Sequence, residues 1–389
     1  MGSFDLPNRD SPDLHLVVAT RDELRALQHE NSEEWRGALS LEAYLRREEH
    51  LYSQDMTKEG GMTPWMLVHQ PDPDGPRKVL CGCETLRKNA LVGRQGKAED
   101  AIAYGICSVF CPEGYRGRGY AGRMMTELGE KLRSWKTDEG ELCLFSVLYS
   151  DIGKDFYAAR GWHPFPSAHV TLPASTRRPA GQVRPLEAND LPALSSTDEA
   201  MLRKQLSAMK TDNRPAVALL PDARTFQWHH AREEFVGKEL HGKPPVVKGA
   251  IIGDSPGARV WAIWTRVWSN PKEETPNTLH ILRLVVEDEA YSDFKPASPD
   301  IAAKSRDTAV AHAVAEVFRA AQYEATQWDM KEVTIWNPTS ATLAAAQTID
   351  PNVTVIQRET DSIASLQWYG SSRTWQDVDW IKNEKFGWC

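Results

Sequence analysis

The chain has 389 residues, of which 41% are hydrophobic and 26% are charged, and its formal net charge at pH 7 is −8. These values are ordinary for a globular protein of two or three domains, and the acidic excess argues against a general nucleic-acid-binding surface. No apolar run is long enough to span a bilayer, and the Met1 end lacks the charged-then-apolar pattern of a signal peptide. We therefore expect a cytoplasmic protein without a nucleic-acid or membrane partner.

Six cysteines in a chain of this length are too few for a disulfide framework. Cys81 and Cys83 form a close pair, but no second pair follows at a spacing typical of zinc ligands. Buried thiols are the simpler interpretation, and no metal site is predicted.

The first half predicts an alternation of strands and helices. Strands are expected over 15–19, 64–69, 78–88, 101–110, 142–148 and 163–172, and helices over 21–35, 41–52, 120–136 and 152–160. A proline-containing stretch over 173–181 predicts a linker.

The second half repeats this order, since 182–194 resembles 16–27 in its pattern. Strands are expected over 247–253, 258–268, 277–287, 332–336 and 353–368, and helices over 304–328 and 340–347. The repeat predicts an α/β fold with mixed sheets, divided into two related domains over 1–176 and 177–389.

The run Tyr-Arg-Gly-Arg-Gly-Tyr-Ala-Gly-Arg over 115–123 lies between an expected strand and an expected amphipathic helix. Glycines let the backbone approach a ligand closely, and the N–H groups of a helix N-terminus attract anions. An isolated run of this kind is more often a surface turn, but the position between strand and helix favours a phosphate-binding cradle.

Arg116, Gly119 and Ala121 match the pattern Arg/Gln-x-x-Gly-x-Gly/Ala, and the run resembles motif A of the GNAT acetyltransferases. The stretch 156–162, Phe-Tyr-Ala-Ala-Arg-Gly-Trp, is similar to the family's Phe-Tyr-x-x-x-Gly-Phe signature. The resemblance implies a tandem GNAT fold, with a catalytic first half and acetyl-CoA as the acyl donor. It assigns binding of this donor to Ser108, Val109, Phe110, Arg116, Gly117, Arg118, Gly119, Tyr120, Ala121, Gly122, Ser150 and Tyr157.

The resemblance also makes Tyr157 the general acid that protonates the departing thiolate of coenzyme A. A phenol suits this task because its ordinary pKa of about 10 keeps it protonated at neutral pH. The alternative is a tyrosine that only packs against a helix. The family often has an asparagine seven residues before this tyrosine, where the present chain has Ser150.

The second half lacks a glycine-rich cradle. Its corresponding stretch, 288–296, contains Asp288, Glu289 and Asp293, which would repel pyrophosphate. We expect this half to bind no coenzyme A, to complete the acceptor site and, because it can cover the catalytic half, to make the protein a monomer.

Phrases in the second half, at 227–235, 261–266, 281–286 and 383–389, resemble the fungal L-lysine ε-amino acetyltransferases of lysine catabolism. This resemblance implies that the acceptor is the ε-amino group of free L-lysine. A polyamine, an amino sugar or a protein lysine remains an alternative acceptor, and a non-catalytic acyl-CoA-binding module is the alternative function.

Five residues of the second half are candidates for substrate contacts: His229, His230, Glu233, Arg266 and Arg283. The adjacent histidines point in different directions on a helix, so they cannot chelate one ion together. Each candidate also has a structural interpretation, as a hydrogen-bonded histidine, a solvated acid, or an arginine paired inside the protein.

The acceptor amine must lose a proton, because a lysine side chain has an ordinary pKa of about 10.4. Glu84 and Tyr104, both in expected strands, are candidate bases. The third is the terminal carboxylate of Cys389, by resemblance to the tandem-GNAT N-myristoyltransferases, with Trp388 expected to anchor it.

Overall fold

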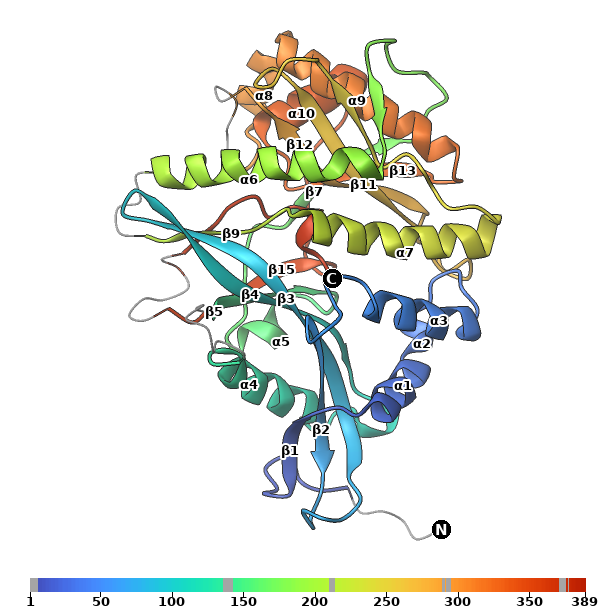
Figure 1. Ribbon diagram of the computed structural model, residues 1–389, viewed down its shortest axis with the longest axis vertical. Helices are drawn as coiled ribbons and strands as arrows, with labels where there is room; N and C mark the ends of the chain where they lie inside the picture. Colours follow the sequence, from blue (N-terminus) through green and yellow to red (C-terminus); the bar gives the residue numbers. More distant parts are fainter. Residues whose placement is uncertain are drawn as a thin grey trace.

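The computed structural model describes residues 6–135, 143–209, 214–288, 291, 295–370, 376 and 378–389. Within these ranges the chain forms two mixed sheets with helices packed around them, stacked along the longest axis of the molecule (Figure 1). The predicted α/β fold with mixed sheets is therefore confirmed. No helix in the described ranges is long and apolar enough to cross a membrane.

The first sheet has nine strands within the described ranges, in the order β1-β2-β3-β4-β5-β15-β6, with β9 pairing to β3 and β16 pairing to β9. Strands β4 and β5 run parallel to each other. The strands are β1 (Leu14–Val18), β2 (Met62–His69), β3 (Lys78–Arg94), β4 (Lys97–Phe110), β5 (Cys143–Ser150), β6 (His163–Pro164), β9 (Ala216–Leu219), β15 (Ile363–Trp368) and β16 (Asp379–Trp380).

The second sheet has seven strands in the same described ranges, in the order β14-β7-β13-β12-β11-β10-β8, and its one parallel pair there is β12 with β13. The strands are β7 (Ala168–Pro173), β8 (Arg184–Leu186), β10 (Gly249–Ile252), β11 (Val260–Val267), β12 (Thr278–Val286), β13 (Glu332–Trp336) and β14 (Ile356–Gln357).

Helices α1 (Arg21–Glu30), α2 (Ser32–Trp35) and α3 (Leu41–Tyr52) precede the first hairpin of the chain. The others are α4 (Tyr120–Leu132), α5 (Asp155–Ala158), α6 (Leu191–Ala208), α7 (Ala223–His241), α8 (Pro299–Ser305), α9 (Ala309–Thr326) and α10 (Ser340–Ile349). In each half, a long helix connects the parallel strands, α4 between β4 and β5 and α9 between β12 and β13. This is the repeat that the sequence predicted.

The two halves exchange strands. The predicted strand 163–172 is divided, with β6 in the first sheet and β7 in the second sheet, where Val170 pairs with Ile335. The predicted strand 353–368 is divided as well, and β15 joins the first sheet with Leu366 opposite Val147. Prolines explain the first division, because Pro164 and Pro166 cannot donate backbone hydrogen bonds. A boundary at 176/177 stays a prediction, but each sheet contains strands from both sides of it.

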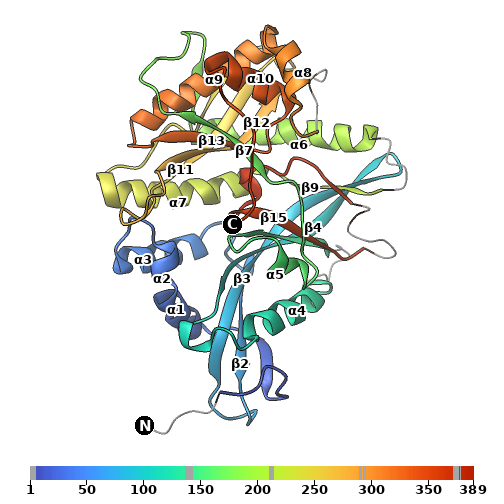
Figure 2. The same cartoon turned by 180° about the vertical axis from the view of Figure 1, so that it is seen from behind.

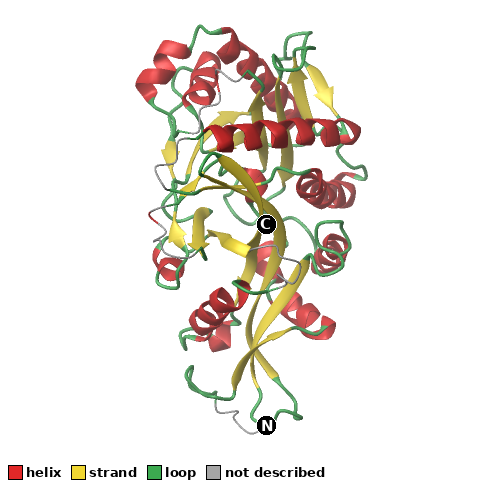
Figure 3. Ribbon diagram, turned by 60° about the vertical axis from the view of Figure 1, so that its left-hand side comes forward, coloured by secondary structure: helices red, strands yellow, loops and turns green. Residues whose placement is uncertain are grey.

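Helices cover both faces of the first sheet (Figure 3). On one face, Met124 and Leu128 of the amphipathic helix α4 pack against Cys83 and Ile106. The opposite face is covered by α1, α3, α7 and the last residues of the chain, where Leu86 packs against buried side chains of α3 and α7. The C-terminus lies between the two halves (Figures 1 and 2). The first sheet therefore separates a face with the predicted cradle helix from a face toward the second half.

Candidate active site

Glycines shape the turn between β4 and α4. Gly117 and Gly119 have φ angles of 76° and 85°, a region that side-chain-bearing residues rarely adopt, and Gly119 is the N-cap of α4. A Cβ atom on Gly119 would lie 2.7 Å from Cδ of Arg9, and one on Gly122 would lie 2.6 Å from Nη2 of Arg160. A side chain at position 119 or 122 would therefore collide with an arginine. Because glycine stands at both positions, the first N–H groups of α4 are accessible to an anion.

Arginines from three parts of the chain lie at this helix N-terminus. Arg116 and Arg118 belong to the turn, Arg9 comes from the N-terminal segment, and Arg160 follows α5. The guanidinium carbon of Arg160 lies 3.9 Å from the ring centroid of Phe156, which orients the group. Clustered positive charge around free N–H groups fits the pyrophosphate of coenzyme A.

The sequence interpretation missed Arg9 and Arg160. Arg160 stands at a variable position of the Phe-Tyr-x-x-x-Gly-Phe signature, so the signature itself does not single it out. Arg9 lies more than 100 residues before α4, and it is placed here because Arg123 donates hydrogen bonds to the carbonyls of Arg9 and Ser11. No local pattern in the sequence could have found Arg9.

Two predicted residues of the cradle have their side chains engaged elsewhere. Arg116 donates from Nε to the carbonyl of Cys111 at 2.9 Å, and its guanidinium lies 3.5 Å from the Glu34 carboxylate. Tyr120 donates its hydroxyl to the carbonyl of Pro7. Tyr120 thus offers its backbone N–H to a ligand, and Arg116 is held against the end of β4.

Strand β4 is irregular where it approaches α4. The register between β3 and β4 shifts between Gly82 and Glu84, and Ser108 has a φ of 53°, which is typical of a β-bulge and strained for serine. Pairing between β4 and β5 ends at Ile106 and Leu148. Residues 108–110 therefore follow the last paired position of β4, with backbone groups that β5 does not use.

Glu84 lies directly beneath this bulge. It pairs with Cys107 across the sheet, accepts a hydrogen bond from Oγ of Ser108 at 3.0 Å, and accepts a longer one from Gln28 at 3.5 Å. Burial, followed by the negative charge of Glu48, raises the pKa of Glu84 to about 7. A carboxyl group with this pKa can accept a proton at neutral pH, which is the property of a general base.

A cavity of about 590 Å³ lies between α1 and α3. It is lined by both Gln28, which donates to Glu84, and Glu48, so one wall of the cavity contacts the candidate base. The lining carries both signs of charge: Arg21, Arg25, Arg46, Glu42, Glu48 and Glu49. Its volume falls in the range of small-molecule sites. The sequence interpretation missed this cavity, because two helices far from the motifs form it.

Tyr157 lies on the opposite face of the first sheet from Glu84. It belongs to the short helix α5 and packs with Cys83 and Leu148 in the α4 cluster. Burial raises the pKa of Tyr157 above its ordinary value, so its phenol is protonated at neutral pH. The candidate acid and the candidate base thus lie on opposite faces of the region where β4 and β5 cease to pair.

Ser150 ends β5 just before α5. Its hydroxyl donates to the carbonyl of Gly153 at 2.7 Å and accepts from the backbone N–H of Ile152 at 3.2 Å. The side chain therefore stabilises the turn into α5.

The structure does not bring Tyr104 together with Glu84. The side chain of Tyr104 lies in the α4 cluster, and its hydroxyl donates to the carbonyl of Trp135 at 3.0 Å. Of the two strand residues predicted as bases, Glu84 alone faces α1 and α3.

The last two residues of the chain are packed against the face of the first sheet that carries Leu86 and Glu84. The Trp388 ring stacks on His229 with centroids 6.3 Å apart, as expected for an anchoring side chain. Sγ of Cys389 lies 2.8 Å from the position that a Cβ on Gly105 would occupy. A hydrogen bond from Cys107 lowers the pKa of the Cys389 thiol to about 7. Catalysis by the terminal carboxylate stays a prediction.

The two adjacent histidines are buried and hydrogen-bonded to the backbone. Nε2 of His229 donates to the carbonyl of Phe386 at 3.1 Å, and Nε2 of His230 donates to the carbonyl of Trp264 at 3.0 Å. Burial lowers both pKa values, that of His230 to about 4, so the rings are neutral. Their bonds tie α7 to the chain end and to β11. No group of three or more potential metal ligands occurs in the described ranges.

Glu233 and Arg266 are partners of each other. Arg266 donates to the Glu233 carboxylate at 2.8 Å, and Lys248 pairs with the same carboxylate at 2.8 Å. These cations hold the pKa of Glu233 below its ordinary value, against the effect of burial. Arg266 is thus an arginine paired inside the protein, which was its structural interpretation, and this network is buried in the second half.

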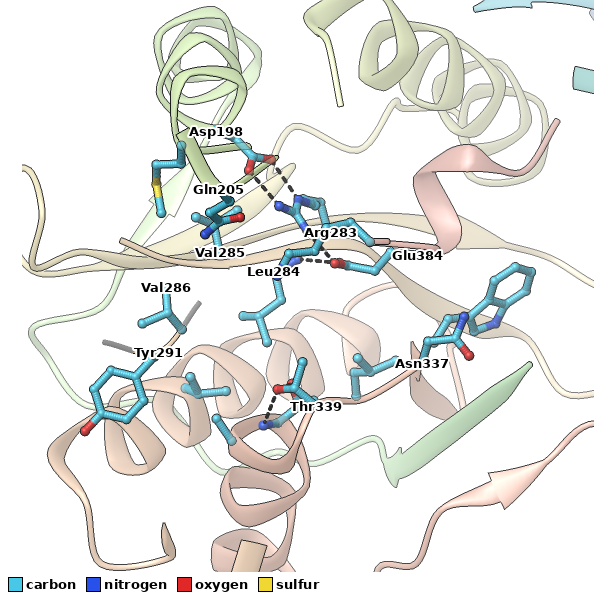
Figure 4. A pocket seen from close by; sticks show the side chains of 17 residues that line it. Asp198, Gln205, Arg283, Leu284, Val285, Val286, Tyr291, Asn337, Thr339 and Glu384 are labelled. Carbon is cyan, nitrogen blue, oxygen red and sulfur yellow. Dashed lines mark hydrogen bonds and ion pairs between the residues drawn. The ribbon is translucent and has the colours of Figure 1, made fainter. Parts of the chain in front are cut away.

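Arg283 is also paired inside the protein. Its guanidinium binds both carboxylate oxygens of Asp198, at 2.6 and 2.7 Å, and pairs with Glu384 (Figure 4). These groups line a cavity of only about 50 Å³ in the second half. The position after β12, which corresponds to the cradle, includes Asp288, whereas Glu289 and Asp293 lie outside the described residues.

Comparisons with known proteins agree with this geometry. A model of the LYC1 GNAT-like C-terminal domain matches residues 169–389. A protein of Yarrowia lipolytica named lysine acetyltransferase is 24% identical over 293 residues, covering 65% of this chain and 72% of that protein.

Two solved structures share the fold at low identity. A GCN5-related N-acetyltransferase of Anabaena variabilis is 14% identical with a TM-score of 0.51, covering 92% of this chain and 73% of that one. The N-myristoyltransferase of Saccharomyces cerevisiae, solved with bound myristoyl-CoA, is 9% identical with a TM-score of 0.53, covering 96% of this chain and 82% of that one.

The matched family model spans more than half of the chain, and the first half contributes the glycine-rich turn before α4, the bulged β4, and Glu84 and Tyr157 as a candidate base and a candidate acid. This chain therefore belongs to the LYC1 GNAT-like family, and it is an acyltransferase of the GNAT type.

Proposed function

We propose that this protein is an acetyl-CoA-dependent N-acetyltransferase that acetylates the amine of a small molecule, with the ε-amino group of free L-lysine as the first candidate. The observation that carries the proposal is Glu84, a buried carboxyl with a pKa of about 7 beneath the bulge at Ser108. An acyl carrier without chemistry would have no use for such a group, whereas a protonated amine must lose its proton before it attacks.

Acetyl-CoA would supply the acetyl group as a reactive thioester. The N-terminus of α4, with Arg9, Arg118 and Arg160 around it, would bind the phosphates, while Arg116 holds the turn against the end of β4. The edge of residues 108–110 that faces β5 would hold the extended arm of the donor, since pairing with β5 ends at Ile106 and Leu148. These residues fit the donor by charge and by the absence of obstructing side chains.

Proton movements are assigned to two side chains. Glu84 removes a proton from the incoming ammonium group and is held in position by the hydrogen bond from Ser108. Tyr157 donates its phenolic proton to the leaving sulfur from the other face of the sheet. Because both side chains border the same region, we propose direct transfer from donor to acceptor without a covalent enzyme intermediate.

The acceptor would approach through the cavity between α1 and α3. Its charges of both signs suit a polar molecule that carries an ammonium group, and its 590 Å³ exceeds the needs of a free amino acid. The name of the Yarrowia relative favours lysine. A polyamine, an amino sugar or a protein lysine is the second candidate acceptor. We also propose a cytoplasmic monomer.

The test is to incubate the protein with acetyl-CoA and a panel of amines, and to follow release of the coenzyme A thiol. The panel contains L-lysine, spermidine, glucosamine and a lysine-containing peptide. Rapid, saturable turnover with L-lysine is the expected result. Binding of acetyl-CoA without turnover on any amine would contradict the proposal and indicate a binding module.

A further inference from the structure

Lys88 has an unusual environment on the acceptor face of the first sheet. It lies on β3 four residues after Glu84, and strand alternation places Glu84, Leu86 and Lys88 on the same face. Lys88 is only 4% exposed, and its Nζ atom has no hydrogen-bond partner among the described residues. A buried ammonium group without a partner is unfavourable, and lysines are rarely buried unless they are paired.

The Lys88 side chain leans toward Glu84. In the pairing register Lys88 is opposite Ala103, Leu86 is opposite Gly105, and Glu84 is opposite Cys107. Cε of Lys88 lies 2.7 Å from the position of a Cβ on Gly105, so the side chain has crossed to β4 and moved one pair nearer to Glu84. Any larger residue at position 105 would block this path.

The surroundings of Lys88 favour a negatively charged ligand. Two further basic side chains, Lys385 and Arg232, lie 4.0 and 5.5 Å from the Trp388 ring centroid, beside Cys389, and burial lowers the pKa of both, that of Arg232 to about 9. His229, which stacks on the same ring, is neutral because burial lowers its pKa. The Cys389 thiol shares the space over Gly105 with Lys88. Arg232 is therefore the basic neighbour that keeps its charge at neutral pH, and the acidic neighbour, Cys389, forms no hydrogen bond with Nζ of Lys88 in the described part of the chain.

We infer that Lys88 binds the carboxylate of the acceptor, so that the substrates of this protein are amines that also carry a carboxylate. This inference rests on the proposed function. The Cα atoms of Glu84 and Lys88 are roughly 13 Å apart along an extended strand, and the lean of Lys88 shortens the gap between the charged groups. The ε-nitrogen and carboxylate of L-lysine are separated by roughly 7 Å in an extended chain. A polyamine or an amino sugar has no carboxylate that Lys88 could bind.

The test compares three acceptors that share a primary amine on a chain of similar length. L-lysine has both the carboxylate and the α-amine, 6-aminohexanoate has only the carboxylate, and cadaverine has no carboxylate. Each is assayed with the wild-type protein, with Lys88→Met and with Lys88→Arg. Methionine keeps the length of the stem without its charge, and arginine keeps the charge. Lys97→Met removes an exposed lysine from the same sheet and is the control.

The wild-type protein should acetylate L-lysine and 6-aminohexanoate with kcat/KM values roughly 10- to 100-fold above that for cadaverine, the range of one charge-assisted hydrogen bond. Lys88→Met should raise KM for the two carboxylates by the same factor, leave kcat nearly unchanged and leave cadaverine unaffected. Lys88→Arg should retain part of the preference. Calorimetry with CoA-saturated protein should show the same loss of L-lysine affinity in Lys88→Met.

A wild-type protein that uses cadaverine as well as L-lysine would overturn the inference and leave the proposed acetyltransferase intact. The same conclusion follows if Lys88→Met binds acetyl-CoA normally and keeps the wild-type preference for L-lysine. Absence of turnover with all three amines in the wild-type protein would instead count against the proposed lysine acceptor itself. If Lys88→Met fails to bind acetyl-CoA, the inference is tested by the other two proteins. It then requires that the wild-type protein prefers carboxylate-bearing amines and that Lys88→Arg keeps part of this preference.

Discussion

Glu84 provides the sharpest prediction at the scale of single residues. Its charged form is required for proton removal, and burial raises its pKa to about 7, so kcat/KM should rise as the pH increases through about 7 and then level off. Glu84→Gln cannot accept the proton, and kcat/KM should fall roughly 10²-fold or more, without an inflection near pH 7. The measurement is the pH profile of kcat/KM for both proteins.

Glu48→Gln is the matched control for this profile. The negative charge of Glu48 is the second cause of the raised pKa of Glu84. Its removal should shift the inflection to lower pH, and the position of the inflection is the readout, because Glu48 also lines the proposed acceptor cavity. An inflection that persists unchanged in Glu84→Gln would assign the titration to another group, such as the Cys389 thiol.

Tyr157 yields an independent prediction on the other face of the sheet. Tyr157→Phe keeps the ring in the α4 cluster and removes only the phenolic proton. We expect kcat to fall roughly 10²-fold or more while the affinity for acetyl-CoA stays nearly constant, because the tyrosine acts on the leaving group and not on the phosphates. Steady-state kinetics and calorimetry measure these quantities, and full activity of the variant at neutral pH would exclude the role.

At the scale of elements, β4, its following turn and α4 together form the proposed donor site. Gly117 lies in this turn with a φ of 76°, and a Cβ there would meet no atom within 4 Å. Asparagine and aspartate both tolerate this backbone region, so Gly117→Asn and Gly117→Asp differ mainly in charge. Gly117→Asp should weaken acetyl-CoA binding roughly 10-fold or more, because its carboxylate faces the phosphates, whereas Gly117→Asn should have a small effect.

Calorimetry with acetyl-CoA measures both affinities, and melting temperatures verify that the two variants fold alike. Equal affinities for Gly117→Asp and Gly117→Asn would show that no phosphate lies near this turn, and the donor would then have to bind elsewhere.

At the scale of the whole molecule, strand exchange joins the two halves into one folding unit. A fragment of residues 1–176 would lack β9 and β15, and its β7 would have lost its partner β13. We expect this fragment, and likewise 177–389, to show no cooperative thermal transition alone, because unpaired strand edges and exposed cores result. Co-expression of the two fragments should restore the cooperative thermal transition. A cooperative melt of 1–176 on its own, followed by circular dichroism, would contradict this expectation.

The second half of the molecule bears on how many donor molecules one chain binds. The second half has a cavity of about 50 Å³ where Arg283 pairs with Asp198, and no glycine cradle precedes α9. One molecule of coenzyme A per chain is therefore expected in a calorimetric titration. A stoichiometry of two would mean that the second half retains a donor site.

Local patterns in the sequence were sufficient for the repeated strand–helix order and for the glycine-rich turn before α4. Helical spacing of apolar residues predicted α4, and glycines with positive φ angles occupy the turn before it, since both features depend on neighbouring residues alone. The same reasoning identified Glu84, Tyr104 and Cys389 as candidates for the general base. It could not rank them, because the face of a sheet on which a side chain lies is decided by the register between strands.

The sequence by itself thus determined the order of the elements, the glycine-rich turn before α4 and a short set of candidate acids and bases. Tertiary structure decided the rest. It divided two predicted strands between the sheets, supplied protein partners to Glu233, Arg266 and Arg283, and left the buried ammonium of Lys88 without a hydrogen-bond partner among the residues that the structure describes. The physical reason is that pairing, burial and charge compensation depend on residues distant along the chain, and these meet only when the sheets have formed.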